Sequence, residues 1–394
     1  MSRFHSYINN ACKILEQYKG DTPFSIFIKQ FFSKEKKFGS TDRKQISGLC
    51  YNYFRVGHAV RKKINADTLL VATFLCSREK SVLINNLKPD WEEKLILSLE
   101  EKISFLKLDI NFSELFPFKE ELNDEIDFDQ FSKSFLIQPD LFIRIRPIHI
   151  TDVTDKIKKA DIPFTQVTNS CIQYPQGTDV EKFLVLDKEI VIQDYNSQQV
   201  LNYLIEHINE FTSTNDLSIW DCCAASGGKS ILLKDILPTN FNLTVSDIRP
   251  GIMTSLQQRF KRAAIKDYRH FIADLSKPLN IPSNEKFDII ICDAPCTGSG
   301  TWSRTPEQLY FFDCSAINEF VTMQKKIVSN TIPHLKENGL FFYITCSVFK
   351  KENESIAVYI KEEFNLEMVE MKNLYGYNKK ADSMFVAVFK NPSS

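Results

Sequence analysis

Residues 217–237 read LSIWDCCAASGGKSILLKDIL, and this stretch decides the fold. The apolar residues 217–220 predict a strand, and residues 230–237 predict a helix. The turn between them, residues 221–230, consists mainly of small residues, which let the backbone approach a ligand, and the helix start offers free N–H groups. A strand that enters a helix through such a turn is the opening unit of a doubly wound α/β fold.

The end of this turn, residues 228–230, matches the end of the phosphate-binding loop G-x-x-x-x-G-K-[ST]. The first glycine of that pattern would fall at position 223, which is Cys223, so the sequence disfavours a nucleoside triphosphatase. A small-residue turn between strand and helix also suits the carboxylate end of an amino-acid cofactor that carries a nucleoside. We favour this second interpretation.

The alternation of strands and helices continues to the C-terminus. Residues 287–292 form a near-continuous apolar run, as expected for a strand buried on both faces. Residues 385–389 predict a closing strand in an antiparallel edge hairpin. Further strands are predicted at 243–246 and 340–344, and helices at 252–264, 317–335 and 353–363. We therefore predict an α/β domain with a doubly wound, mostly parallel sheet over residues 191–394.

Residues 1–125 have few strand signals and are predicted to be helical. Apolar residues from Ile46 to Phe54 recur with helical spacing after a turn and N-cap signal at residues 39–42. Basic side chains on or beyond this helix could contact phosphates or form a solvated face, and the sequence leaves both alternatives open. These side chains are Arg43, Lys44, Arg55, Arg61, Lys62 and Lys63.

Between these regions, residues 130–190 predict a small α+β insert. Residues 141–147 alternate as in a strand, residues 151–160 predict a helix, and residues 183–186 and 189–192 predict two more strands. Two arginines on the first of these strands suggest either contact with RNA or a core-and-edge position. They are Arg144 and Arg146.

The composition limits the classes of protein to which this chain can belong. The chain has 394 residues, and its 49 Lys and Arg nearly balance 50 Asp and Glu, so a nucleic-acid partner would need a local basic face. No run of about 18 apolar residues and no signal peptide is evident, so we expect a cytoplasmic protein outside the membrane. Its ten cysteines should be reduced, and without a C-x-x-C pair we expect no metal site. Nothing implies an oligomer, and a monomer is expected.

Polar and nucleophilic side chains follow the predicted strands. Cys296 and Cys346 each come after a buried strand, at the edge where an open α/β sheet presents reactive groups, and two thiols suggest a covalent step with a helper. Asp247 ends another strand and could accept hydrogen bonds from ribose hydroxyls or cap a helix. Asp274 could accept from an adenine amino group.

Several motifs occur in an order that resembles the RNA cytosine-5 methyltransferases of the Sun/Fmu (NOL1/NOP2/Sun) family. The loop at residues 221–230 resembles the family motif D-x-C-A-A-P-G-G-K-T, and residues 293–298 and 345–347 resemble D-A-P-C-S-G and T-C-S. Residues 192–198, 304–307 and 352–354 also resemble the family. The resemblance covers residues 190–394. Residues 42–55 more weakly resemble the helical NusB-like RNA-binding domain of bacterial members.

The resemblance implies a Rossmann-like class I S-adenosylmethionine methyltransferase domain, preceded by the NusB-like domain and an RNA-binding insert. It implies that Cys346 attacks carbon 6 of cytosine, that Cys296 assists release, and that Asp293 binds the cytosine edge. Lys229 would favour the thiolate. The S-adenosylmethionine contacts implied by the resemblance are Cys223, Ala224, Ala225, Ser226, Gly227, Gly228, Lys229, Asp247, Asp274 and Asp293.

The partner implied is RNA, with small-subunit ribosomal RNA first and transfer RNA second. Ser226 replaces the usual proline of the cofactor motif, and we expect weaker cofactor binding at most. Arg304 stands alone where many members have two arginines. The rival is a non-catalytic RNA-binding or ribosome-assembly factor. A DNA cytosine methyltransferase fits less well, because its nucleophile follows proline and would leave the T-C-S motif without a role.

Overall fold

The computed structural model describes residues 3–60, 64–207, 217–237, 240–278 and 284–393. It divides into two compact units, which we describe separately. The helical unit comprises Met1–Glu120, Asp124–Gln138 and Trp302–Cys314, and the α/β unit comprises Glu121–Asn123, Pro139–Thr301 and Ser315–Ser394. Among the described residues, no helix is long and apolar enough to span a bilayer.

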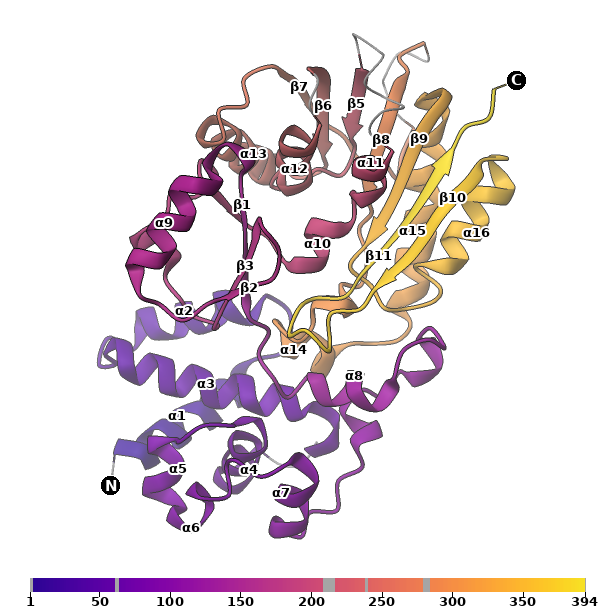
Figure 1. The fold of residues 1–394 in the computed structure, drawn as a ribbon. Helices are drawn as coiled ribbons and strands as arrows, with labels where there is room; N and C mark the ends of the chain where they lie inside the picture. Colours follow the sequence, from indigo (N-terminus) through magenta and orange to yellow (C-terminus); the bar gives the residue numbers. More distant parts are fainter. Residues whose placement is uncertain (1–2, 61–63, 208–216, 238–239, 279–283, 394) are drawn as a thin grey trace. The chain divides into compact units, whose positions relative to one another are not determined.

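The N-terminal region is helical, as predicted, and the helices of the helical unit enclose an aromatic-rich core. Helix α3 (Ser40–Val56) covers the apolar stripe expected there, and Ile46, Leu49 and Tyr53 are buried. Three short 3₁₀ turns connect the helices. The other α-helices are α1 (Arg3–Gln17), α2 (Phe24–Lys34), α4 (Ala66–Cys76), α5 (Val82–Leu87), α6 (Pro89–Glu92), α7 (Leu99–Leu106), α8 (Phe128–Ser134) and α14 (Pro306–Phe311) (Figure 1).

Helix α14 joins this unit from far along the chain. The ring of Tyr310 packs against Tyr53 and Phe54, and Phe311 packs edge-on against Tyr18. Gly20 has a positive φ of 80°, and a Cβ there would lie 2.7 Å from the Phe311 ring, so both the turn and the close approach require glycine. Residues 302–314 therefore complete the helical core, although they are flanked on both sides by α/β sequence.

The structure corrects one expected phosphate contact in this unit. Arg55 is 2% exposed, and its guanidinium donates to the backbone oxygens of Phe135 and Ser303 and to the side chain of Gln138. These hydrogen bonds join separate segments of the chain, so Arg55 has a structural role and does not contact phosphate. Arg43 and Lys44 are exposed, whereas Arg61, Lys62 and Lys63 lie outside the described residues.

The α/β unit is built on a seven-stranded sheet with strand order β10-β11-β9-β8-β5-β6-β7. The five strands from β7 to β9 are parallel, and β11 pairs antiparallel with β9 and β10, which gives the predicted edge hairpin (Figure 1). The strands are β5 (Leu217–Asp221), β6 (Phe241–Asp247), β7 (Tyr268–Ile272), β8 (Phe287–Asp293), β9 (Leu335–Thr345), β10 (Glu367–Leu374) and β11 (Met384–Lys390).

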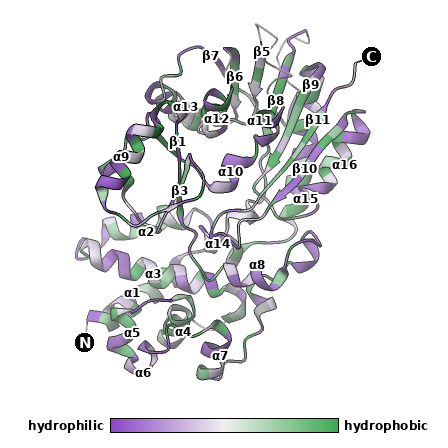
Figure 2. Ribbon diagram, in the orientation of Figure 1, coloured by the Kyte–Doolittle hydropathy of each residue, from purple (hydrophilic) through white to green (hydrophobic). Residues whose placement is uncertain are grey.

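Helices cover both faces of this sheet, so the predicted doubly wound α/β architecture is confirmed. Apolar residues of α11, α12 and α13 pack on one face, and those of α15 and α16 on the other. The central strand β8 is largely hydrophobic (Figure 2), and its residues 289–292 are buried, as its apolar run predicted. The helices are α10 (Tyr195–Gln199), α11 (Asn202–Glu206), α12 (Gly228–Ile236), α13 (Pro250–Arg262), α15 (Ala316–Thr331) and α16 (Glu354–Glu363).

The helix predicted at 317–335 ends earlier than expected. Helix α15 stops at Thr331, and Leu335 already begins β9. Pro333 lies between them and has no backbone N–H to continue the helix.

A second, four-stranded antiparallel sheet has the order β2-β3-β1-β4 and carries α9 (Ile150–Ala160). Its strands are β1 (Leu141–Ile145), β2 (Thr165–Gln166), β3 (Cys171–Tyr174) and β4 (Ile190–Ile192). The strand predicted at 183–186 is wrong. The chain turns there instead, with Asp187 at a φ of 62° and the Val185 backbone donating to the Glu189 carboxylate. Strand β3 was not predicted.

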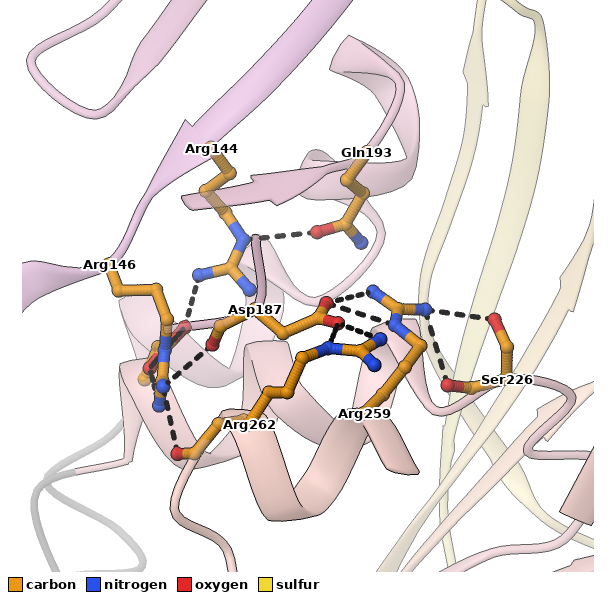
Figure 3. Close-up of polar contacts among 9 residues, drawn as sticks. Arg144, Arg146, Asp187, Gln193, Ser226, Arg259 and Arg262 are labelled. Atoms are coloured by element: carbon orange, nitrogen blue, oxygen red, sulfur yellow. Dashed lines mark hydrogen bonds and ion pairs between the residues drawn. The ribbon is translucent and has the colours of Figure 1, made fainter. Parts of the chain in front are cut away.

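Of the two alternatives for the arginines of β1, the structure favours the core-and-edge position. Arg144 is 4% exposed and its guanidinium lies 2.5 Å from the carboxylate of Asp235 on α12. Arg146 pairs with the same carboxylate and donates to the backbone oxygen of Ala263 (Figure 3). Both side chains are committed to contacts inside the α/β unit and are not available to RNA.

Candidate active site

The candidate site lies where the parallel strands end. The strand order reverses between β5 and β8, and ligands of open α/β sheets bind outside the carboxyl ends of strands at such a switch point. Two cavities open there, of about 520 and 300 Å³. Both are lined by Cys223, Ala225, Asp293 and Cys346, so they adjoin one another.

The small-residue loop, residues 221–230, connects β5 to α12 in a strained conformation. Ala225 has a φ of 46° and Gly227 a φ of 82°. A Cβ on Gly227 would lie 2.6 Å from the ring of Phe260, so only glycine fits at the start of α12. The Ala224 backbone N–H donates to the Ser246 carbonyl, which fixes the loop beside β6.

An arginine fastens the same loop from outside. Arg259 on α13 donates to the backbone oxygen of Ser226 at 3.2 Å and to its hydroxyl at 2.8 Å. The carboxylate of Asp187, which is 6% exposed, accepts from Arg259 and Arg262 (Figure 3). Serine thus has a structural role at the position where proline was expected, because its hydroxyl accepts a hydrogen bond that a proline side chain could not accept.

Two carboxylates end the neighbouring strands. Asp247 accepts from the backbone N–H of Ala225 and from Arg249. Burial pushes the pKa of Asp247 upward, but the bonds from Arg249 outweigh burial and hold that pKa below its ordinary value. The Arg249 side chain is 58% exposed and can move aside for a ligand hydroxyl. Asp274 accepts from Ser276, which lowers its pKa.

The two thiols predicted to react lie together. The Sγ atoms of Cys296 and Cys346 are 3.5 Å apart, and both side chains are partly exposed. Contact with the Cys346 sulfur, together with burial, raises the pKa of Cys296 well above its ordinary value. The two Sγ atoms lie within hydrogen-bonding distance of each other, and either thiol can be the donor.

A buried carboxylate fixes the two thiol loops, residues 294–300 and 346–352. Glu352 is fully buried, and one of its oxygens accepts from the Thr297 backbone at 2.9 Å and the Gln324 amide at 3.1 Å. The other oxygen accepts from the hydroxyls of Thr297 at 2.6 Å and Ser347 at 2.5 Å. Burial raises the pKa of Glu352 despite these four bonds.

One glycine lets the thiol loops come close. The Gly300 N–H donates to the Cys346 carbonyl at 2.9 Å, and a Cβ on Gly300 would lie 2.2 Å from the Ser383 carbonyl oxygen. No side chain fits in that space, so glycine at this position determines how near the two cysteines lie.

A lysine and two aspartates complete the site. Lys229 on α12 lies 2.5 Å from the carboxylate of Asp293. Burial alone would lower the pKa of Lys229, but Asp293 outweighs it and keeps the lysine cationic. Burial raises the pKa of Asp221 to about 7. One oxygen of Asp221 accepts from Ser230, and the other has no partner in the described part of the chain.

The structure brings the predicted site residues to one edge. Of the predicted set, Gly227 alone lines neither cavity, and its role is conformational. The sequence analysis missed the residues that fix the loops, because these residues can be recognised only from their contacts in the folded structure. They are Asp187, Arg249, Arg259, Gln324 and, apart from its place in a motif, Glu352.

Comparison with known proteins shows what this chain is similar to. Residues 210–390 match the family model described as 16S rRNA methyltransferase RsmB/F. This region is similar to the RsmB/F methyltransferases. The ribosomal RNA small subunit methyltransferase B of Enterobacter sp. (strain 638) is 31% identical over 178 residues. That match covers 45% of this chain and 39% of the relative, so it spans about two fifths of the length of that RsmB/F protein.

Solved structures support the fold across a longer stretch. The crystal structure of PH0851 covers 99% of this chain and 99% of its own, with a TM-score of 0.69 at 17% identity. NSun6 from Pyrococcus horikoshii, solved with SFG, covers 71% of this chain and 97% of its own, with a TM-score of 0.58 at 14% identity. The α/β unit thus has the Rossmann-like fold of S-adenosylmethionine-dependent methyltransferases.

Proposed function

We propose that this chain transfers a methyl group from S-adenosylmethionine to carbon 5 of a cytosine in RNA. The observation that carries the proposal is the pair of thiols, Cys296 and Cys346, 3.5 Å apart on a methyltransferase sheet edge. Carbon 5 of cytosine is a weak nucleophile, and addition of a thiolate to carbon 6 activates it. One thiol that bonds to carbon and a second that handles a proton meet this need.

The cofactor fits the larger cavity by the chemistry of its lining. Carboxylates of Asp247 and Asp274 face one end, where they would accept from ribose hydroxyls and the adenine amino group. Ile248, Leu275 and Ile327 give that cavity apolar walls suited to a purine. The small-residue loop would hold the methionine end. S-adenosylmethionine, when bound there, supplies an electrophilic methyl group.

We assign different roles to the two thiols, following the motifs in which they lie. Cys346 is the nucleophile: its sulfur adds to carbon 6, and carbon 5 gains the electron pair. The electron pair at carbon 5 then takes the methyl group. Once Cys346 is bonded to carbon, its sulfur no longer raises the pKa of Cys296, and Cys296 gives its proton to solvent. The Cys296 thiolate then takes the carbon 5 proton, the double bond reforms, and Cys346 leaves as thiolate.

Lys229 and Asp293 act together on the substrate and nucleophile. Lys229 and Cys346 line the same cavity, where the cationic lysine would favour a thiolate nucleophile. Lys229 also holds the Asp293 carboxylate beside both cavities, where Asp293 would accept from the amino group of cytosine. The ion pair between Lys229 and Asp293 stabilises both charges where little water reaches them.

We further propose that the substrate is small-subunit ribosomal RNA. The support is that the Enterobacter relative is named for this RNA and that the matched region contains the site residues from Cys223 to Cys346. Exposed basic residues of the helical unit, such as Arg43 and Lys44, would contact phosphates.

The test combines two variants of the thiol pair. Cys346→Ala should reduce 5-methylcytosine formation to background, because no adduct can form. Cys296→Ala should methylate poorly and accumulate a covalent protein–RNA complex, because release is blocked. Bisulfite sequencing of RNA measures the first result and a denaturing gel the second. Cys314→Ala, outside the site, is the matched control.

Normal turnover by Cys346→Ala would overturn the mechanism. A wild-type protein that binds RNA but not millimolar S-adenosylmethionine in calorimetry would instead favour a non-catalytic RNA-binding factor.

A further inference from the structure

Three cysteines outside the proposed reaction meet beneath the small-residue loop. Cys222 and Cys223 follow β5, and Cys292 is the penultimate residue of β8. The strands pair side by side, with the Cys222 N–H donating to the Ile291 carbonyl at 2.9 Å (Figure 1). The three Sγ atoms all lie within 4.8 Å of one another, and all three cysteines are free.

This spacing suits one metal ion. Three sulfurs each about 2.3 Å from an ion, the usual Zn–S distance, lie about 4 Å from each other in a trigonal plane. The cluster needs only a small contraction to reach that geometry. Within the described residues the group has no histidine or carboxylate as a fourth ligand, which favours trigonal over tetrahedral coordination. Thiolate ligands alone select soft cations.

The surroundings admit and favour a cation. Cys222 and Cys292 are fully buried, whereas Cys223 is partly exposed and lines both cavities, so an ion can enter from the site. Asp221 directly precedes Cys222 in the chain, and Asp293 directly follows Cys292. A buried cation bound by thiolates therefore lies near carboxylates that offset its charge.

We propose that Cys222, Cys223 and Cys292 form a trigonal site for a soft, thiophilic cation such as Cu(I) or Cd(II). Binding displaces the thiol protons to solvent and involves no change of oxidation state. Because Cys223 belongs to the small-residue loop, an ion there draws the loop toward β8. Occupancy thus competes with any ligand that needs the loop in its present conformation.

The test uses Cd(II) and the full chain in a background that carries Cys296→Ser and Cys346→Ser. These changes remove the other thiol pair, which also attracts soft metals. We expect a thiolate-to-metal charge-transfer band that saturates at about one Cd(II) per chain. Adding Cys292→Ala should abolish the band. Cys171→Ala, a buried cysteine of β3, should leave it unchanged.

Absence of the band in the background, or its persistence in both Cys292→Ala and Cys222→Ala, overturns the proposal. The second variant covers the case in which the first fails to fold, and circular dichroism checks each. A competition experiment then links the site to the cofactor. Cd(II) should weaken S-adenosylmethionine binding at least tenfold in the background and not in Cys292→Ala. Because the band is measured without cofactor or RNA, metal binding and the proposed methyl transfer can fail independently.

Discussion

The small-residue loop and the thiol loops share one sheet edge but are held by different contacts. The small-residue loop is fastened by charges, since Arg259 bridges Ser226 to the carboxylate of Asp187. The thiol loops are fastened by neutral donors that converge on Glu352. The charged anchor comes from the region of the four-stranded sheet and is partly exposed at Arg262, whereas the neutral anchor joins residues 297, 324 and 347 to Glu352 and is buried.

This difference indicates that the two halves of the site can be disturbed separately. Loss of the charged anchor should loosen cofactor binding and spare the thiols. Loss of the neutral anchor should separate the thiols and spare the cofactor. Each variant below is therefore measured twice, by cofactor affinity and by adduct formation with RNA.

The largest effect is expected for Glu352→Ala. The change leaves buried donors from Thr297, Ser347 and Gln324 without their acceptor, and each such donor costs about 1–3 kcal/mol. We expect the free energy of unfolding to fall by about 3–5 kcal/mol and adduct formation to be lost. Chemical denaturation measures the first. Glu352→Gln keeps an acceptor in the same volume and should lose less than half as much; equal losses would contradict the hydrogen-bond account.

A smaller effect is expected for Asp187→Ala. Arg259 loses its carboxylate and no longer holds Ser226 firmly, while Arg262, whose side chain is 49% exposed, can turn to water. We expect about 1–3 kcal/mol of lost stability, since partial exposure reduces the cost of breaking a buried pair. Calorimetry should show weaker S-adenosylmethionine binding with adduct formation retained at saturating cofactor. Unchanged affinity would show that the charged anchor does not act on the loop.

The pH dependence of stability separates the loops further. The pKa values of Glu352 and Asp221 are both raised, so the folded state binds these protons more tightly than the unfolded state. Stability should therefore fall as pH rises, by up to about 1.4 kcal/mol per pH unit per group. For Asp221 the window runs from its ordinary pKa of 3.8 to about 7. Asp221→Asn should remove the fall in the free energy of unfolding over this window. Glu352→Gln should remove the fall at pH values below the raised pKa of Glu352. If either variant keeps the pH dependence of the wild type, the assignment to that carboxyl is contradicted.

The smallest effect is expected for Ser226→Ala. The Arg259 guanidinium loses the hydroxyl acceptor at 2.8 Å but keeps the Ser226 carbonyl. One such bond is worth about 0.5–1.5 kcal/mol, so cofactor binding should weaken by about two- to tenfold. Thr254→Ala on the exposed face of α13 is the control. If Ser226→Ala binds as tightly as the wild type, the hydroxyl contributes nothing to the loop.

Most of the fold could be predicted from local patterns in the sequence. The strand, turn and helix at 217–237 and the apolar run at 287–292 were predictable because each pattern is complete within a short window. The same logic put Cys296 and Cys346 at one sheet edge. Their exact roles stay a prediction.

The failures have a common physical cause. The burial of Arg144 depends on Asp235, which lies on a different element, so alternation along β1 could not reveal it. Residues 183–186 are apolar enough for a strand, but the chain reverses at Asp187, where Arg259 and Arg262 stabilise the turn. The cysteine cluster was missed because Cys292 lies about 70 residues after the adjacent Cys222 and Cys223 and no metal-binding spacing links them.

The placement of residues 302–314 has a consequence for protein synthesis. The helical unit begins at the N-terminus, yet its core needs Tyr310 and Phe311, which the ribosome adds only near residue 310 of 394. When the first 138 residues have been translated, the rings of Tyr53 and Phe54 therefore still lack the Tyr310 ring against which they pack. The helical unit therefore reaches its final core only after residues 139–301, which belong to the α/β unit, have been translated.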